Sequence, residues 1–444
     1  MTAAKPSGRG PRIRLLADIR PLRESAEYRR LWAGQSLSAI GSQMTAVALP
    51  FQVYALTHST LAVGALGLTT AVPLIVVGML GSTLADAFDR RKLVLVTSAG
   101  LAVVALLLVT QAVLDVRHLG LLYTLSTVHS CLFAIDQPAR RTFIPRLLPP
   151  DRLPAAGALS QISFQASMTV GPLVAGVVIA TAGLEAAYLL DAVTFLAGLY
   201  AVLRLRAMPP ANGGQGPGLG AVAEGLRFAR RHPLIAAVFL VDLNAMVLGA
   251  PRALFPAFAE ARFDGGSQTL GLLYAAPAVG GVLASVFSGW LGHTRRQGRA
   301  MLAAGVVWGA VLIGFGLSTA LWMALLMLMA AGACDVVSDV FRSTVLQVST
   351  PDQLRGRLSG LDFVVSAGGP RLGEVRAGAV SQLTSPAIGA VSGGISCVIG
   401  AVILACTFPA LRRYDARSAG STTANGDSSG TTAGETDTEV PAQK

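Results

Sequence analysis

Five polar or charged residues stand inside long apolar segments in the second half of this sequence. Asp335 lies near the middle of one segment, Arg371 and Glu374 near the middle of the next, and Asp242 and Asn244 belong to an earlier one. A charged side chain in hydrocarbon costs ~2.5 to 3.5 kcal/mol on insertion scales, so such residues line a cavity or pair with one another. A buried carboxyl group can also exchange a proton when its surroundings change. These five residues are therefore candidates for substrate binding and proton coupling.

Two of the five can satisfy each other. Arg371 and Glu374 are three residues apart and can share one helix face. A structural ion pair explains them as well as a role in proton coupling does, and the sequence leaves both interpretations open.

A turn of acidic and basic residues, 81–92, follows the second apolar segment. Asp86 stands at the predicted end of a helix, and Arg90 and Arg91 come after it. A carboxylate there can stabilise the N-terminus of a neighbouring helix, whose exposed amides carry partial positive charge. We expect Asp86 and the two arginines to form a conformational latch for an outward-facing state. The alternative is a solvated turn whose arginines set the membrane topology.

Three further residues are assigned to the same latch. Asp136, Arg140 and Arg141 lie toward the inner end of the fourth apolar segment. Pairing with one another or with Asp86 explains them better than contact with a substrate, because they lie away from the middle of the segment.

The fifth apolar segment contains a candidate gating hinge. Pro172 removes one backbone hydrogen bond and bends a helix, while Gly171 and Gly176 allow another helix to approach closely. Ordinary packing of small residues between helices is the alternative interpretation.

Apolar helices must position all of these residues. Hydrophobic residues make up 52% of the chain and charged residues only 13%, against roughly 25% charged residues in soluble domains. Residues 61–80 and 93–114 carry no charge, and each stretch is long enough to cross a hydrocarbon core of ~30 Å. The sequence therefore predicts an all-α integral membrane protein with twelve transmembrane helices in two six-helix bundles. The expected spans are 31–56, 61–85, 93–114, 119–142, 154–181, 185–205, 234–258, 269–292, 300–318, 321–348, 357–382 and 387–409.

The positive charge is concentrated on one side of these spans. On that side lie 30 of the 35 Lys and Arg residues. By the positive-inside rule this side is cytoplasmic, which predicts a multi-pass protein of the cytoplasmic (inner) membrane with both termini inside. The net charge of +11 then reflects topology and contact with anionic lipid rather than nucleic acid, because the basic residues have no interleaved aromatics.

The chain divides at a linker rich in proline and glycine. Shifting the first half by 201 positions places Arg141 on Arg342 and Asp151 on Asp352, which favours two repeated halves. The expected parts are a basic cytoplasmic tail at 1–30, a six-helix bundle at 31–205, a cytoplasmic linker with an amphipathic helix at 206–233, a second bundle at 234–410, and a disordered cytoplasmic tail at 411–444.

The sequence shows no pattern typical of an enzyme. It has no phosphate-cradling glycine loop and no metal-ligand spacing, and its four cysteines lie within apolar segments. We therefore expect no enzymatic activity, no metal and no cofactor.

Several of these motifs resemble those of the major facilitator superfamily. Residues 81–92 are similar to its signature loop, with Ser82 and Asp89 in place of glycines, and residues 167–176 resemble its antiporter motif. Further blocks resemble the enterobactin exporter branch, which is grouped with drug:proton antiporters. These blocks are 49–52, 57–60, 136–145, 252–259, 271–277 and 344–357.

This resemblance implies a substrate site between the bundles, with the segment of Asp335 facing the cavity, so Asp335 is the first candidate for proton coupling. It also implies a monomer that exports a siderophore or drug-like small molecule by proton antiport with alternating access. The expected partners are the small-molecule substrate, protons and the lipid bilayer. An importer of nutrients or sugars, and a non-transporting membrane sensor, are the alternatives.

Overall fold

The regular elements of the described chain are all helices. The computed structural model describes residues 18–87, 89–206, 219–287, 294, 296–350 and 352–413. The long helices of the first half are α2 (Ala26–Thr57), α3 (Thr60–Ala87), α4 (Arg90–Val113), α5 (Leu119–Arg141) and α7 (Leu153–Leu203). Those of the second half are α9 (Pro233–Leu248), α11 (Gly266–Val286), α12 (Gln297–Leu317), α13 (Leu321–Ser349), α14 (Asp352–Leu383) and α15 (Pro386–Thr407).

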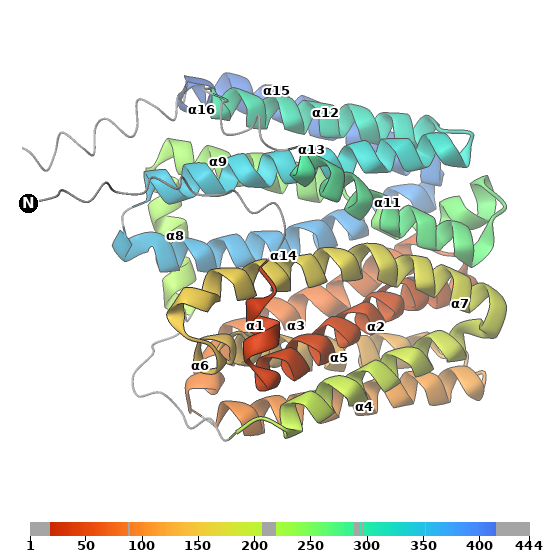
Figure 1. The fold of residues 1–444 in the computed structure, drawn as a ribbon. Coiled ribbons are helices and arrows are strands. Elements are labelled where there is room, and N and C mark those ends of the chain that lie inside the picture. The colour runs from red at the N-terminus through yellow and green to blue at the C-terminus, as the bar shows by residue number, and fades with distance from the viewer. Residues whose placement is uncertain are drawn as a thin grey trace, which may run out of the picture.

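These helices make twelve membrane crossings. Nine helical segments of the described chain are long and apolar enough to span a membrane, and one of them, Pro150–Leu203, is long enough to cross twice. Within it, Gly183 has φ 86° and ψ 174°, a conformation open to glycine, and there the chain turns back (Figure 1). The more polar helices α2 and α14 complete the set. The all-α fold with twelve transmembrane helices is confirmed.

The two halves lie side by side, with their helices running in nearly the same direction (Figure 1). Helix α3 packs on α14, and α7 packs on α11, along the boundary between the halves. Between described residues, two hydrogen bonds cross this boundary: Ser267 Oγ donates to the Gly176 carbonyl over 3.2 Å, and Thr60 Oγ1 donates to the Gly378 carbonyl over 3.0 Å. Both lie toward the same end of the molecule, where the two halves are therefore joined.

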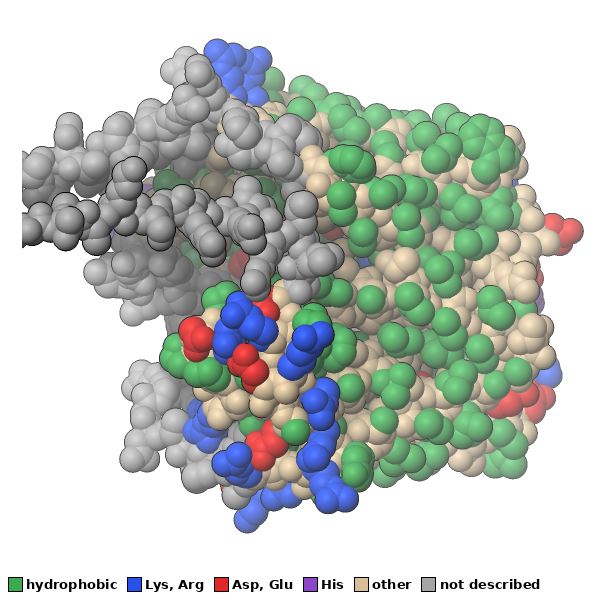
Figure 2. All heavy atoms as spheres, in the orientation of Figure 1, with side chains coloured by type: hydrophobic (Ala, Val, Ile, Leu, Met, Phe, Trp, Pro, Cys, Tyr) green, Lys and Arg blue, Asp and Glu red, His purple; other side chains and the backbone are tan. Residues whose placement is uncertain are grey.

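Short helices gather at the other end, which we call the basic end. They are α1 (Arg20–Glu24), α6 (Ile144–Leu147), α8 (Leu219–Arg231) and α16 (Pro409–Arg413). Figure 2 shows most of the visible Lys and Arg side chains there, beside a broad surface of hydrophobic side chains. We call the end with the two boundary hydrogen bonds the opposite end.

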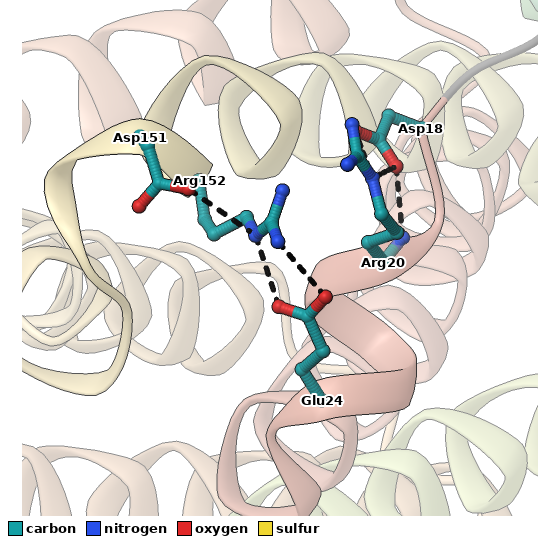
Figure 3. A network of polar contacts seen from close by, with 5 residues as sticks. All are labelled: Asp18, Arg20, Glu24, Asp151 and Arg152. Atoms are coloured by element: carbon teal, nitrogen blue, oxygen red, sulfur yellow. Dashed lines mark hydrogen bonds and ion pairs between the residues drawn. The ribbon is translucent and has the colours of Figure 1, made fainter.

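Charge pairs order the chain at the basic end (Figure 3). Arg152, at the start of α7, donates to both oxygens of Glu24 over 2.9 and 3.0 Å, which ties α1 to α7. Asp18 accepts hydrogen bonds from the side chain and backbone of Arg20, and the side-chain bond lowers the pKa of that carboxyl to about 2. Because this pKa is depressed, any stability from the pair is present at neutral pH and is lost only as the pH falls toward 2.

The predicted span 234–258 is interrupted. Helix α9 ends at Leu248, residues Gly249 to Pro251 are not helical, and the chain continues as the 3₁₀-helix η2 (Arg252–Leu254), the short α10 (Phe255–Ala257) and the π-helix η3 (Phe258–Arg262). Pro251 has no N–H to donate to a carbonyl one turn earlier, and glycine is a poor helix former. The predicted span 234–258 is therefore one membrane crossing whose helix is interrupted.

Candidate functional site

Arg342 is the centre of a charged cluster inside the second half. This buried side chain on α13 donates to Asp242 on α9 over 2.7 Å, to Asp339 on its own helix over 2.5 Å, and to Asp362 on α14 over 2.8 Å. Ser366 accepts a fourth bond over 3.3 Å. One guanidinium therefore joins three helices and faces three carboxylates, so the cluster carries excess negative charge when all three are ionised.

Asp335 lies one turn before Asp339 on α13 and has no such partner. Its side chain is exposed, and among the described residues no hydrogen bond or ion pair reaches it. Arg342, the nearest arginine along the helix, is taken up by the other three carboxylates. Asp335 is thus the member of this region that is free to bind a proton or a ligand.

A cavity of about 150 Å³ opens at Asp335. Helices α9, α12, α13 and α14 and the interruption after α9 form its wall. Its lining residues are Val241, Asp242, Ala245, Met246, Gly249, Ala250, Pro251, Arg252, Ala304, Gly305, Trp308, Cys334, Asp335, Ser338 and Pro370. Carboxyl groups, an arginine and an aromatic side chain converge on an otherwise mostly apolar space, which is the usual character of a small-molecule site.

Three neighbouring helices support the interruption after α9. The indole N–H of Trp308 on α12 donates to the Gly249 carbonyl over 3.3 Å, and Arg376 on α14 donates to the Leu248 carbonyl over 3.1 Å. The Tyr274 hydroxyl on α11 reaches the Arg252 carbonyl over 3.4 Å. Backbone groups released from a helix within a membrane must find partners, and here side chains supply them.

The Arg371–Glu374 pair lies at the boundary between the halves. Arg371 donates to both Glu374 oxygens over 3.1 Å. A side chain at Gly67 on α3 would place its Cβ 2.7 Å from a Glu374 oxygen, so this glycine makes room for the carboxylate. The two residues do share a helix face, and any separation of α3 from α14 would expose Glu374.

Asn244 faces away from the cavity. Its amide donates to the Cys397 carbonyl over 3.0 Å, and its oxygen lies where a Cβ at Gly400 would stand. It therefore connects α9 to α15 and does not share the site of Asp242 and Asp335.

The acidic and basic residues of α5 form a buried network with α4. Arg140 pairs with Asp136 and donates to Ser98 Oγ over 2.6 Å, while Thr97 Oγ1 donates to Asp136 over 2.6 Å. The backbone of Arg141 ends α5, but its side chain lies outside the described residues. The pair holds two helices of the first half together.

The turn between α3 and α4 is described in part. Asp86 belongs to α3, and its side chain is outside the described part of the chain. Asp89 caps α4 by accepting from the backbone N–H groups of Arg91 and Lys92 over 2.9 and 3.1 Å, so a residue found in place of glycine serves as a helix cap. Arg91 donates to the Leu203 carbonyl at the end of α7 over 2.7 Å, and Arg90 is the first residue of α4.

The three predicted hinge residues pack closely against other helices. A Cβ at Gly171 would lie 2.4 Å from Gln43 on α2, and one at Gly176 would lie 2.7 Å from the Ser267 carbonyl on α11. The Pro172 carbonyl faces Gly271 of α11. Gly171 therefore contacts a helix of its own half, whereas Pro172 and Gly176 contact the other half.

Four buried or paired charged residues were not predicted as site residues from the sequence. Arg342 was counted with the topogenic arginines, and Asp339 and Asp362 were not singled out. Asp191 on α7 is also buried, and it accepts a hydrogen bond from Thr45 over 2.5 Å. The available signal for Asp191 and Asp339 was their position inside apolar segments, the same signal that selected Asp335.

The fold and the site define a class. The helices cross a membrane twelve times, polar residues converge inside one half, and the described residues contain no group of His, Cys, Asp and Glu suited to a metal. This is the architecture of a membrane transporter.

The family follows from comparison with known proteins. Residues 17–428 match the model of the family described as "Transmembrane secretion effector", and the chain belongs to this family of the major facilitator superfamily. It is 27% identical over 400 residues to proteins named enterobactin exporter EntS from Shigella boydii serotype 18 and Escherichia coli O81. The match covers 90% of this chain and 96% of each relative.

Solved structures share the fold. A POT family transporter in complex with 5-aminolevulinic acid aligns with a TM-score of 0.72 at 11% identity, over 88% of this chain and 97% of that one. The nucleoside transporter NupG aligns with a TM-score of 0.67 at 15% identity, over 87% of this chain and 99% of that one. At these identities the likeness shows the fold alone.

Proposed function

We propose that this protein is a secondary active exporter that moves a siderophore or a drug-like small molecule out of the cytoplasm by proton antiport with alternating access. The observation that carries the proposal is Asp335, a carboxylate that lines a cavity within the membrane-spanning bundle and has no partner among the described residues. A relationship to proteins named enterobactin exporters, extending over nearly the whole chain, supports the direction of transport.

The proton and the cargo would use the same charged region. A carboxylate that changes its exposure between two states of the protein changes its proton affinity, because burial disfavours the ionised form. Asp335 is the first residue proposed for this exchange, and Glu374 and Asp242 are the next. Export requires that cargo and proton bind in different states, so that neither crosses freely.

The basic end is proposed to face the cytoplasm. Most of the lysines and arginines belong to segments at this end. Both termini would then lie on the cytoplasmic side of the inner membrane. The boundary hydrogen bonds of Thr60 and Ser267 would close the external side of the protein. In this arrangement the latch around Asp86 lies at the cytoplasmic side and the hinge around Pro172 lies within the boundary.

The test is transport into inverted membrane vesicles that contain the purified chain. We expect a proton gradient to drive uptake of a catecholate siderophore or a drug-like substrate, with a matching substrate-dependent proton release reported by a pH-sensitive dye. Loss of this uptake is expected in Asp335→Asn. Asp115→Asn is the matched control for that variant, because Asp115 is an exposed aspartate in the connection between α4 and α5. A substrate that moves equally well without a gradient, or a gradient unaffected by every substrate, would contradict proton antiport.

A further inference from the structure

The size of the cavity restricts what it can hold. At about 150 Å³ it is far smaller than a whole siderophore or drug-sized molecule. Protein cavities of this volume hold a single benzene molecule. The cavity therefore suits one ring-sized group of a larger cargo, with the remainder lying outside it.

The wall favours an aromatic ring. Apolar side chains from α9 and α14, including Val241, Met246 and Pro370, form much of it. Trp308 adds an indole whose N–H is already bonded to the Gly249 carbonyl, so its orientation is fixed without a ligand. An aromatic group gains contact area and ring-to-ring contact against such a side chain.

Two charged groups on the wall have no partner in the described part of the chain. Asp335 comes from α13 and Arg252 from η2, both side chains are exposed, and both line the cavity. Among the described residues neither forms a side-chain hydrogen bond, and no ion pair joins them within 4.0 Å. The cavity thus offers one strong acceptor and one strong donor that are separate from each other.

This arrangement selects the charge of the ligand. Asp242 also lines the wall, but Arg342 already pairs with it. A cation would bind Asp335 but would be repelled by Arg252, and an anion would be repelled by Asp335 and by the carboxylates around Arg342. A neutral ring that carries one hydrogen-bond donor and one acceptor satisfies both side chains. Hydrogen bonds to charged partners are the stronger kind, so both contacts would contribute to selection.

The site is built before any ligand binds. The carbonyls released at Leu248 and Gly249 are satisfied by Arg376 and Trp308, so the interrupted helix needs no ligand to complete it. Non-helical backbone at membrane depth is characteristic of transporter binding sites. The interruption also places Arg252 on the wall of the cavity.

From these contacts we propose that the cavity at the interruption of α9 binds one neutral aromatic ring of the cargo, whose donor faces Asp335 and whose acceptor faces Arg252. The proposal rests on the export function proposed above, and it adds the chemical class of group that the protein recognises.

A native cysteine allows a direct test. Cys334 lines the cavity, and the other three cysteines are Cys131 on α5 and Cys397 and Cys406 on α15. In a full-length chain with those three replaced by alanine, alkylation of Cys334 by a small thiol reagent reports occupancy of the cavity. The probe is 2-hydroxybenzamide, a neutral ring with a donor and an acceptor; benzylammonium and benzoate are the charged comparison compounds.

We expect 2-hydroxybenzamide to slow the alkylation of Cys334 in a saturable way, at concentrations where benzylammonium and benzoate have little effect. Asp335→Leu and Arg252→Met should each raise the apparent dissociation constant ~10-fold or more, because each removes one charge-assisted hydrogen bond. Thermal unfolding of both variants shows whether they are folded. A chain that retains only Cys131 is the control, and its alkylation should not respond to the probe.

Equal protection by all three compounds, protection of Cys131, or no protection by 2-hydroxybenzamide would each overturn the proposal. So would folded variants with unchanged protection. The assay needs no gradient and no transport. Protection of Cys334 without export would therefore contradict only the proposed function. Export without protection of Cys334 would contradict only this inference.

Discussion

Arg342 shows how one residue organises the charged region. It pairs with three carboxylates from three helices, and the most buried of them, Asp242, has no other ion-pair partner among the described residues. A buried ion pair is weak evidence for net stability, but the loss of one partner leaves an uncompensated charge behind. The cluster therefore constrains the fold even though one of its members, Asp242, also lines the cavity.

Arg342→Ala should lower the free energy of unfolding by about 3 to 5 kcal/mol, because Asp242 would remain buried without a cation. Thermal unfolding in detergent measures the change. The matched control is Arg152→Ala, which breaks the more exposed pair with Glu24 and should cost about 1 kcal/mol or less. Equal losses in the two variants would show that the Arg342 cluster is not a structural centre.

Asp335→Asn should abolish proton-driven uptake into inverted vesicles and retain some substrate exchange, since exchange requires alternating access without net proton release. Glu374→Gln is the comparison, because Arg371 already holds that carboxylate in a pair. Normal transport by Asp335→Asn together with loss in Glu374→Gln would move the coupling role to α14. If both variants transport normally, Asp242 is the next residue to test.

The sequence identified the candidate carboxylates more readily than the arginine that pairs with one of them. Asp335 and Asp242 are recognisable because any carboxylate in an apolar run is exceptional. Arg342 is not recognisable in this way, because it lies near the end of a segment, where arginines commonly set topology. Its partner Asp242 is 100 residues away in the sequence. Pairing between distant helices is a product of packing, which no local pattern contains.

At the scale of the helix, close contact between the halves depends on small residues. Gly176 on α7 leaves so little space that a Cβ would lie 2.7 Å from the Ser267 carbonyl and 3.2 Å from the Cα of Gly271. A larger residue there must push α7 and α11 apart. The candidate hinge is therefore also a contact between the two halves, as the packing interpretation expects, and its role in gating stays a prediction.

Gly176→Val should separate the halves at the opposite end and increase the rate at which a cysteine placed at Ser267 is alkylated from that side. Ser267 is now buried and bonded across the boundary, so it reports the separation directly. Gly157→Val is the control on the same helix, because a Cβ there has no neighbour within 4 Å. An unchanged rate in Gly176→Val would mean that α11 adjusts without opening.

The helices themselves were largely predictable, and the interruption of α9 was not. Pro233–Arg262 contains an 18-residue window with a mean hydropathy of 2.0, so a search for apolar runs finds one span. Gly249 and Pro251 are the local signal, yet Pro172 stands inside α7 without any non-helical residue near it. What separates the two cases is the set of neighbouring side chains that satisfy the released carbonyls, and only the folded structure shows these.

For the whole molecule, the twelve crossings and their division into halves follow from segment length, apolarity and the distribution of arginines. The proposed function adds that the halves move relative to each other. The contacts that cross the boundary, and the latch proposed at Asp86, would then set which state is favoured.

Asp86→Asn should impair transport and leave the unfolding temperature almost unchanged, because it removes a charge that is needed in only one state. Asp89→Ala is the matched comparison three residues away. Asp89→Ala removes the cap of α4 and should lower the free energy of unfolding by ~1 kcal/mol. Wild-type efflux by Asp86→Asn would rule out the latch.

The turn-back at Gly183 is one of several very short connections at the opposite end. The others are His58–Ser59, Leu114–His118, Phe263–Gly265, Ser318–Ala320 and Thr384–Ser385. A protease or antibody approaching from that side finds almost no exposed loop long enough to bind. Epitope tags and reporter insertions should therefore succeed at the basic end, and on the other side only the five residues of Leu114–His118 give an insertion room without pulling two helices out of register.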